Sequence, residues 1–185
     1  MIKKLLLPLF LLNILVTQSL AQQNDNYLLW SANRKLTAED FYIKTGQPEL
    51  SAAFAQFSME YSIKGYDVFT KNFNKKVKNS FIKSASSIDT TIDITQTIKY
   101  EQTLFDLNEI YARQFRKALR ENRKKLGKGL AIAEELNEQV VTELAKRRLN
   151  YINETKNGTD ATKQKEWEVQ IEKELNELAK YSYEN

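Results

Sequence analysis

The sequence predicts an α+β fold in which antiparallel strands, including a hairpin, come first and three long helices follow. Two patterns indicate this order. Apolar and polar residues alternate over residues 54–64, which is typical of a half-buried strand. From about residue 95 onward, apolar residues recur at steps of three and four, which is the spacing of an amphipathic helix. Strands and helices are therefore expected in different halves of the chain.

Residues 1–21 have the features of a cleaved signal peptide. Two lysines at positions 3 and 4 precede an apolar run over residues 5–16, and Ser19-Leu20-Ala21 ends the segment. This run is shorter than the ~20 apolar residues that span a membrane, and no later run approaches that length. We therefore expect an exported protein, periplasmic or secreted, that starts at Gln22 and has no membrane anchor.

The remaining residues 22–185 suit a single domain with one core. The formal net charge of the whole chain is +4, and two of the positive charges lie in residues 1–21. The charge of residues 22–185 is therefore close to balanced, and these residues show no groove-reading motif. Both observations give little support for nucleic-acid binding. The chain has no cysteine and no histidine. This excludes disulfides, Ser-His-Asp and Cys-His nucleophiles, and the side chains that dominate protein zinc sites.

Strands are expected in the first part of this domain. The alternating residues on one face of the first strand are Ala55, Phe57, Met59, Tyr61 and Ile63. A turn at Lys64-Gly65 and even spacing over residues 66–73 predict a hairpin partner. Shorter strands are expected at residues 27–30 and 77–82, and residues 84–89 are expected to form a polar loop. Thr37-Ala38-Glu39-Asp40 resembles a capping box, which predicts one short helical turn.

The first long helix is expected to begin between residues 93 and 98. Its apolar stripe consists of Leu104, Leu107, Tyr111, Phe115, Ala118 and Leu119. Gly127 and Gly129 interrupt the pattern, and a second helix is expected to end near Asn157-Gly158. Asp160 can cap a third helix, whose apolar residues are Trp167, Ile171, Leu175 and Leu178.

The first helix contains a zinc-helix pattern that lacks its histidines. An H-E-x-x-H helix works because residues four apart share one face, so that two imidazoles bind zinc while the glutamate activates the metal-bound water. Here the segment reads Tyr100-Glu101-Gln102-Thr103-Leu104. Tyr100 and Leu104 cannot hold zinc in this way. Only the glutamate of the pattern remains.

Three segments together resemble a known family. The first matches a W-x-x-x-R-x-L-T-x-x-D-F pattern at Trp30, Arg34, Leu36, Thr37, Asp40 and Phe41. The second matches an H-E-Q-x-H-F-D-x-x-E-x-Y-A-R pattern at Glu101, Gln102, Phe105, Asp106, Glu109, Tyr111, Ala112 and Arg113. The third matches a Y-x-x-x-T-x-H-G segment, followed by Gln and Trp, at Tyr151, Thr155, Gly158, Gln164 and Trp167. On these residues the chain is similar to the bacterial domain of unknown function 922 family, exported proteins predicted to be zinc-dependent peptidases.

The resemblance implies a metallopeptidase-like scaffold that has lost its zinc. Tyr100 and Leu104 replace the two histidines of the helix, and Asn157 occupies the histidine position of the third segment. Because Tyr100 and Leu104 share the apolar stripe of the helix, we expect the vacated site to be filled and closed. The leading hypothesis is a non-catalytic binding or scaffold protein of the cell envelope, without a cofactor, whose partner is an unknown envelope protein or peptide.

A second hypothesis is a metal-independent hydrolase that uses Glu101 with Asp106 or Glu109. A carboxylate whose pKa is raised by burial can act as a general base without a metal. The simpler interpretation makes Glu101 a surface or structural residue. Gln102, Asp106, Glu109 and Arg113 also share a helix face and could form a carboxylate site for Ca²⁺, although that ion takes about six to eight oxygens. An ion pair between Glu109 and Arg113 is the simpler expectation.

A third hypothesis is a basic module that binds an anionic envelope surface. The positive residues are Arg113, Arg116, Lys117, Arg120, Arg123, Lys124, Lys125 and Lys128. The alternative is internal balancing of these charges by glutamates of the second helix, namely Glu134, Glu135, Glu138 and Glu143. Most charge runs are only solvated faces. Because these glutamates could answer several of the positive charges, we favour internal balancing.

Overall fold

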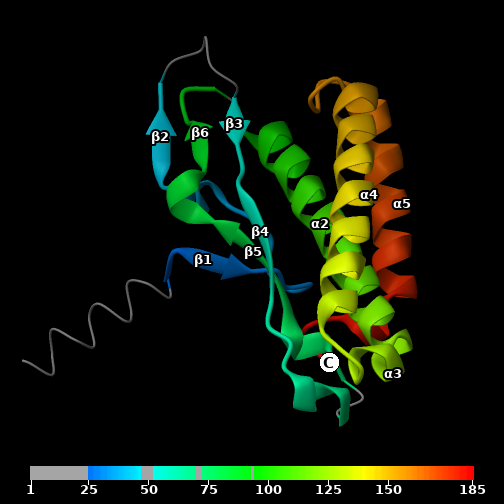
Figure 1. The fold of residues 1–185 in the computed structure, drawn as a ribbon. Coiled ribbons are helices and arrows are strands. Elements are labelled where there is room, and N and C mark those ends of the chain that lie inside the picture. The colour runs from blue at the N-terminus through cyan, green and yellow to red at the C-terminus, as the bar shows by residue number, and fades with distance from the viewer. Residues whose placement is uncertain (1–24, 47–51, 70–71, 93) are drawn as a thin grey trace, which may run out of the picture.

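The computed structural model describes residues 25–46, 52–69, 72–92 and 94–185. The predicted signal peptide, residues 1–21, lies outside the described residues, so export stays a prediction. The α+β prediction is confirmed, because two small sheets precede three long helices (Figure 1). Within the described residues, no helix is both long and apolar enough to cross a membrane.

The first sheet is antiparallel and has the order β1-β5-β4, formed by Tyr27–Leu29, Val77–Ile82 and Phe57–Tyr61. Both short strands expected from the sequence, at residues 27–30 and 77–82, are confirmed. The strand expected over residues 54–64 is confirmed only over residues 57–61, and residue 54 belongs to the other sheet. The predicted alternation holds in β4, where Phe57 is buried and pairs across the strands with Phe81 of β5 at a ring distance of 5.9 Å. Cross-strand aromatic pairs of this kind stabilise a sheet and fix its register.

The second sheet has the order β2-β6-β3, formed by Ile43–Thr45, Ser87–Asp89 and Ala53–Phe54. β2 is parallel to β6, and β3 is antiparallel to it. The prediction of a polar loop over residues 84–89 is therefore wrong for its last three residues. A three-residue strand shows no alternation in the sequence, and β6 is defined by backbone pairing on both sides and by the buried Ile88.

The predicted hairpin partner at residues 66–73 is also wrong. Gly65–Phe69 is a 3₁₀ helix, in which the Phe69 side chain is 85% exposed, and β4 pairs with β5 instead. The buried Asp67 explains the difference. Its carboxylate accepts the Lys64 backbone N–H at 2.7 Å and forms an ion pair with Lys76 at 2.8 Å. Such local closure of the backbone by a carboxylate competes with strand formation.

The three predicted helices are α2 (Thr95–Glu121), α4 (Ala131–Thr155) and α5 (Ala161–Glu177). A short α3 (Arg123–Leu126) lies in the glycine-containing connection between α2 and α4. α4 ends where Lys156, Asn157 and Gly158 adopt positive φ. Asp160 caps α5 as predicted, because its Oδ1 accepts the Lys163 backbone N–H at 3.0 Å. The capping box at Thr37 forms as well, with the Thr37 N–H donating to the Asp40 carboxylate at 2.9 Å.

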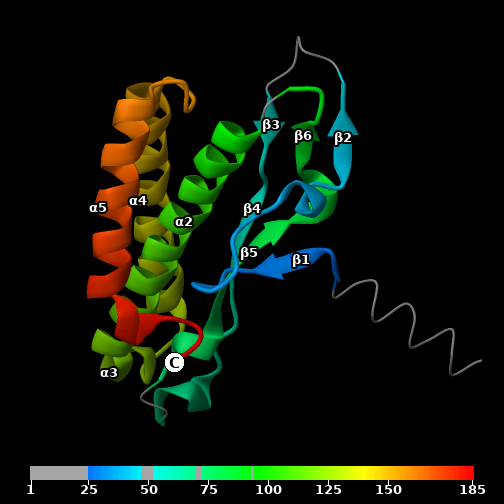
Figure 2. The ribbon, with the colours of Figure 1, turned by 180° about the vertical axis from the view of Figure 1, so that it is seen from behind.

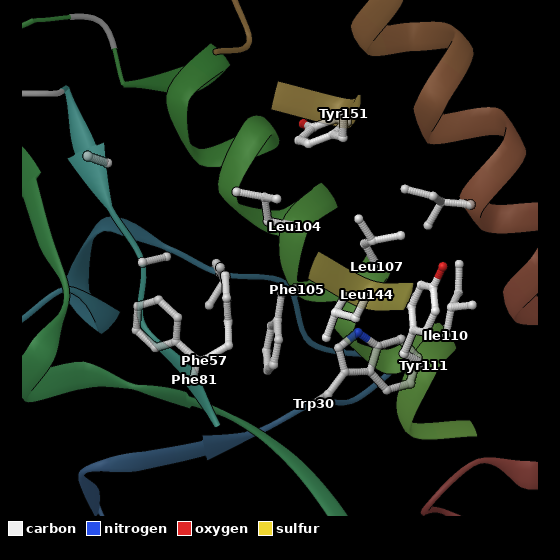
Figure 3. Close-up of a cluster of buried hydrophobic side chains, with 14 of the residues drawn as sticks. Trp30, Phe57, Phe81, Leu104, Phe105, Leu107, Ile110, Tyr111, Leu144 and Tyr151 are labelled. Atoms are coloured by element: carbon white, nitrogen blue, oxygen red, sulfur yellow. The ribbon is translucent and has the colours of Figure 1, made fainter. Parts of the chain in front are cut away.

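Helix α2 lies between the strands and the pair formed by α4 and α5, which Figures 1 and 2 show from opposite sides. The main core follows from this layering. Phe57 and Phe81 of the first sheet pack with Phe105 of α2, while Leu107 of α2 and Leu144 of α4 extend the cluster toward the other helices (Figure 3). Because it is covered on both sides, α2 is buried over much more than a single stripe.

The middle of α2 carries a buried ion cluster made of Glu109, Arg113 and Arg116. The Glu109 side chain is fully buried, and its Oε1 accepts from Arg113 Nε at 3.0 Å and from Arg116 Nη1 at 2.7 Å. Asn79 of β5 donates to the other carboxylate oxygen at 3.3 Å. The predicted Glu109–Arg113 ion pair is thus confirmed, and a second arginine joins it.

The two arginines of this cluster connect α2 to the rest of the fold. Arg113 donates to the Leu175 carbonyl of α5 at 2.6 Å. Arg116 donates to the Val77 carbonyl of β5 at 2.9 and 3.1 Å and to the Tyr181 carbonyl near the C-terminus at 3.0 Å. Arg113 and Arg116 were expected on a basic surface, and this is wrong, because the Glu109 carboxylate and these carbonyls hold both guanidinium groups inside the protein.

Replacing Glu109 with glutamine should destabilise the protein by about 3–5 kcal/mol, because two guanidinium groups then stay buried without a counter-charge. Urea unfolding followed by circular dichroism measures this loss. Glu143→Gln is the matched control, since the one ion pair of Glu143 among the described residues is with the exposed Lys146 at 2.7 Å, and the substitution should lower the stability by less than about 1 kcal/mol. Equal stability losses in the two variants would contradict the central role of the buried cluster.

Candidate functional site

A cleft of about 690 Å³ opens where β3, the start of α2 and the α4–α5 turn meet. These three elements lie at the same end of the molecule in both ribbon views (Figures 1 and 2). The lining residues are Ala52, Ala53, Phe54, Ala55, Gln96, Thr97, Tyr100, Glu101, Leu104, Arg148, Ile152, Asn157, Gly158 and Thr159. The structure therefore brings together the three expected ligand positions, Tyr100, Leu104 and Asn157, and places Glu101 beside them.

Tyr100 acts as a packing residue at one wall of this cleft. Its ring stacks on Tyr151 of α4 at a centroid distance of 5.2 Å. It also lies directly against Gly158, whose φ is +81° and where a Cβ atom would come within 2.8 Å of the Tyr100 ring. Burial, followed by the nearby Glu101 charge, raises the pKa of Tyr100 to about 12, so that its phenol stays neutral.

Leu104 forms the floor of the cleft and belongs to the main core. Its side chain is only 4% exposed, and Figure 3 shows it with Phe57 and Phe81 of the sheet on one side and Tyr151 on the other. The expected filling of the vacated positions is therefore observed, but the expected closure of the site is wrong. Because the Tyr100 ring turns to Tyr151 and Gly158, it leaves the space between α2 and β3 open.

Glu101 is buried in the cleft, and one of its two carboxylate oxygens has no hydrogen-bond partner among the described residues. Its side chain is 4% exposed, and its Oε2 atom has no partner among the described residues. Burial raises the pKa of Glu101 to about 7, against a smaller opposing effect of the Arg148 charge. Glu101 is thus not the surface residue that the simpler interpretation allowed, whereas the structural role that it also allowed stays a prediction.

Arg148 of α4 is the second charged group in the cleft, and no sequence motif singled it out. Its neighbour Arg147 pairs with Glu174 at 2.5 Å, whereas Arg148 makes no ion pair within the described residues. The Arg148 guanidinium lies 5.8 Å from the centre of the Phe57 ring. The sequence feature that could have identified Arg148 is its helical spacing. It falls midway between the apolar residues Leu144 and Ile152, on the face that α4 turns inward.

Asp106 and Glu109 do not join Glu101 in the cleft. Asp106 accepts the Trp30 indole N–H at 2.7 Å and the Gln102 amide at 2.8 Å, and it pairs with Lys35 at 3.3 Å. Glu109 is held in the buried ion cluster. Among the described residues, no group of three or more His, Cys, Asp or Glu side chains is arranged to hold a metal ion. The carboxylates of α2 are thus directed to separate partners.

Most other residues that carry the family resemblance fix the scaffold around the cleft. Gln102 accepts the Leu36 backbone N–H at 2.7 Å, which ties the N-terminal segment to α2. The Tyr151 hydroxyl donates to Gln164 of α5 at 2.7 Å, and the Gln164 amide donates to Thr103 of α2 at 2.9 Å. These buried hydrogen bonds set the relative positions of α2, α4 and α5, and with them the walls of the cleft.

The groups at the expected ligand positions do not fit zinc. Tyr100 offers a phenol whose pKa is about 12, Leu104 offers no donor atom, and Asn157 offers an exposed amide. Zinc sites in proteins use thiolate, imidazole or carboxylate groups, usually four ligands or three with a water. Glu101 alone is such a group here, so no step of a reaction can be assigned to a zinc ion on this chain.

The rest of the basic stretch lies at the end of α2 and in α3, away from the residues that line the cleft. Its members are Lys117, Arg120, Arg123, Lys124, Lys125 and Lys128. Within the part of the chain that the structure describes, these residues make one ion pair, between Lys117 and Glu121 at 4.0 Å. The expected balancing by α4 glutamates is therefore not seen as ion pairs. Glu143, for example, pairs with Lys146 of its own helix.

Comparison with known proteins gives no match to any family model, to any curated protein or to any solved structure. The resemblance to the domain of unknown function 922 family therefore stays a prediction. The geometry of the cleft is then the main guide to the function of this chain.

The buried Glu101 should make stability depend on pH. Because its pKa of about 7 in the fold lies above the ordinary value of 4.5, the free energy of unfolding should fall as the pH rises from about 4.5 through about 7. The difference amounts to roughly 3 kcal/mol at about 1.4 kcal/mol per pKa unit. Glu101→Gln should remove this part of the dependence. Urea unfolding of both proteins between about pH 4 and pH 8 measures it, and parallel curves would contradict the burial of an unpartnered carboxyl group.

Gly158→Ala should destabilise the protein by about 1–3 kcal/mol, because the added methyl group meets the Tyr100 ring and the backbone has positive φ. Gly65→Ala is the control, since a Cβ atom there meets nothing within 4 Å. Thermal unfolding compares the two. A Gly158→Ala protein as stable as the Gly65→Ala protein would show that Tyr100 does not pack against the α4–α5 turn.

Proposed function

We propose that this chain is an exported, non-catalytic binding protein that takes its ligand in the Glu101 cleft, on a metallopeptidase-like scaffold that has lost its zinc. One observation carries the proposal. The positions at which a zinc peptidase would hold its metal line an open cleft, and their side chains are a packed phenol, a core leucine and an amide. Export rests on the features of residues 1–21, and the partner is an envelope peptide or protein.

The size and lining of the cleft support a binding role. Its volume of about 690 Å³ lies in the range of small-molecule and peptide sites, roughly 300–1,000 Å³. Such sites are mostly apolar with a few polar groups that fix orientation. Here Leu104, Ile152 and the alanines of the β3 segment supply apolar walls, while Glu101 and Arg148 supply the charges.

The residues of the cleft give weak support for catalysis. Peptide hydrolysis needs an activated water and a group that stabilises the developing oxyanion. Without zinc, Glu101 would have to act without a second carboxylate, because Asp106 and Glu109 are bound elsewhere. Two observations favour a metal-independent hydrolase. The cleft that holds Glu101 is open, and the pKa of Glu101, about 7, suits a general base near neutral pH. This second candidate function predicts a rate that depends on Glu101.

Purified protein should contain no stoichiometric zinc by elemental analysis and should not hydrolyse casein. Stoichiometric zinc would overturn the proposal. Turnover that is lost in Glu101→Gln but kept in Glu121→Gln, a control on the exposed end of α2, would establish the hydrolase instead. An unchanged rate in Glu101→Gln would exclude the Glu101 hydrolase and point to a contaminating peptidase.

A further inference from the structure

Two opposite charges face the cleft, and neither forms an ion pair in the described part of the chain. The Glu101 carboxylate comes from α2 and the Arg148 guanidinium from α4. The Glu101 Oε2 atom has no hydrogen bond, and no ion pair joins the two residues. This contrasts with Glu109 on the same helix, whose carboxylate is bound by two arginines.

A buried carboxylate oxygen without a hydrogen bond is costly to keep. A ligand that brings an ammonium group to Glu101 would supply the missing hydrogen bonds and the missing counter-charge in one step. Arg148 presents a planar guanidinium, the side chain best suited to bind a carboxylate. A molecule that carries both an ammonium and a carboxylate group would therefore match the cleft at both charges.

The apolar walls narrow the class of ligand further. Leu104 and Ile152 line the cleft together with Phe54, whose side chain is exposed at the edge strand β3. Two apolar side chains of a ligand could lie on these walls between the two charges. A single arginine and a buried glutamate make a poor site for a phosphate, which needs several donors. A bare metal ion would lack ligands, because no group of three or more suitable side chains forms among the described residues.

We propose that the cleft binds a short apolar peptide with free ends, with its ammonium group at Glu101 and its carboxylate at Arg148. This inference rests on the proposed function, since it names the ligand class of the same cleft. The volume of the cleft, about 690 Å³, leaves room for more than a single amino acid. Recognition of both ends would select short peptides over internal segments of a long chain.

Isothermal titration calorimetry of the full chain with four forms of leucyl-leucine tests the proposal. The forms are the free dipeptide, its N-acetyl derivative, its C-terminal amide and the doubly capped compound. In the unmodified protein, acetylation and amidation should each weaken binding by at least about tenfold. Acetylation should have little further effect in Glu101→Gln, and amidation should have little further effect in Arg148→Gln. The controls Glu121→Gln and Lys146→Gln, both on exposed side chains, should behave like the unmodified protein.

Each other result counts against the inference. If the doubly capped compound binds as tightly as the free dipeptide, the cleft binds peptides but its charges do not recognise their ends, so the proposed function stands and the inference falls. If none of the four forms binds, the inference falls, and the proposed function is then judged by the zinc and turnover measurements alone. If Glu101→Gln and Arg148→Gln both bind the free dipeptide more weakly, but acetylation and amidation still weaken binding as much as in the unmodified protein, the ends contact other residues. The inference falls in that case as well.

Discussion

The fold depends on one buried carboxylate, Glu109, one oxygen of which accepts hydrogen bonds from two arginines of the same helix. Through Arg113 and Arg116 this carboxylate connects α2 to β5, to α5 and to the C-terminal turn. Because α2 is a rigid helix, fixing its middle also fixes the direction in which its first turns face. Tyr100, Glu101 and Leu104 are thereby directed toward β3 and α4. The net positive charge of the cluster is tolerated because backbone carbonyls accept further hydrogen bonds from both guanidinium groups.

Two glutamates of α2 illustrate how the environment decides the role of a side chain. Both oxygens of Glu109 are bound, by Arg113 and Arg116 on one and by Asn79 on the other, and the residue is 0% exposed, so a ligand cannot reach it. Glu101 is equally buried, and one of its oxygens has no partner in the described residues. An unsatisfied group of this kind weakens the fold, which is understandable where a ligand completes it. The cleft thus differs in its chemistry from a zinc site, although the helix positions at which the resemblance implies zinc ligands border it.

The sequence predicts the elements whose signals are local. Alternation indicated β4, spacing of three and four indicated α2, α4 and α5, and Asp160 marked the start of α5. It could not predict β6, since a three-residue strand is defined by its neighbours, nor the 3₁₀ helix that Asp67 closes where a hairpin strand was expected. In the site, the motif identified Glu101, but it did not predict that one oxygen of this carboxylate lacks a hydrogen-bond partner among the described residues. Whether a charge is paired, as for Arg116, or left facing a cleft, as for Arg148, depends on contacts between distant segments that a single sequence does not display.

We propose that the site bordered by Tyr100, Leu104 and Asn157 receives an organic ligand and not a metal. A crystal structure grown with both zinc and leucyl-leucine, and recorded at the zinc absorption edge, would distinguish the two directly. We expect density for the dipeptide between Glu101 and Arg148, with no anomalous peak in the cleft. An anomalous peak beside Glu101, or a cleft that stays empty while the dipeptide lies elsewhere, would contradict the proposal.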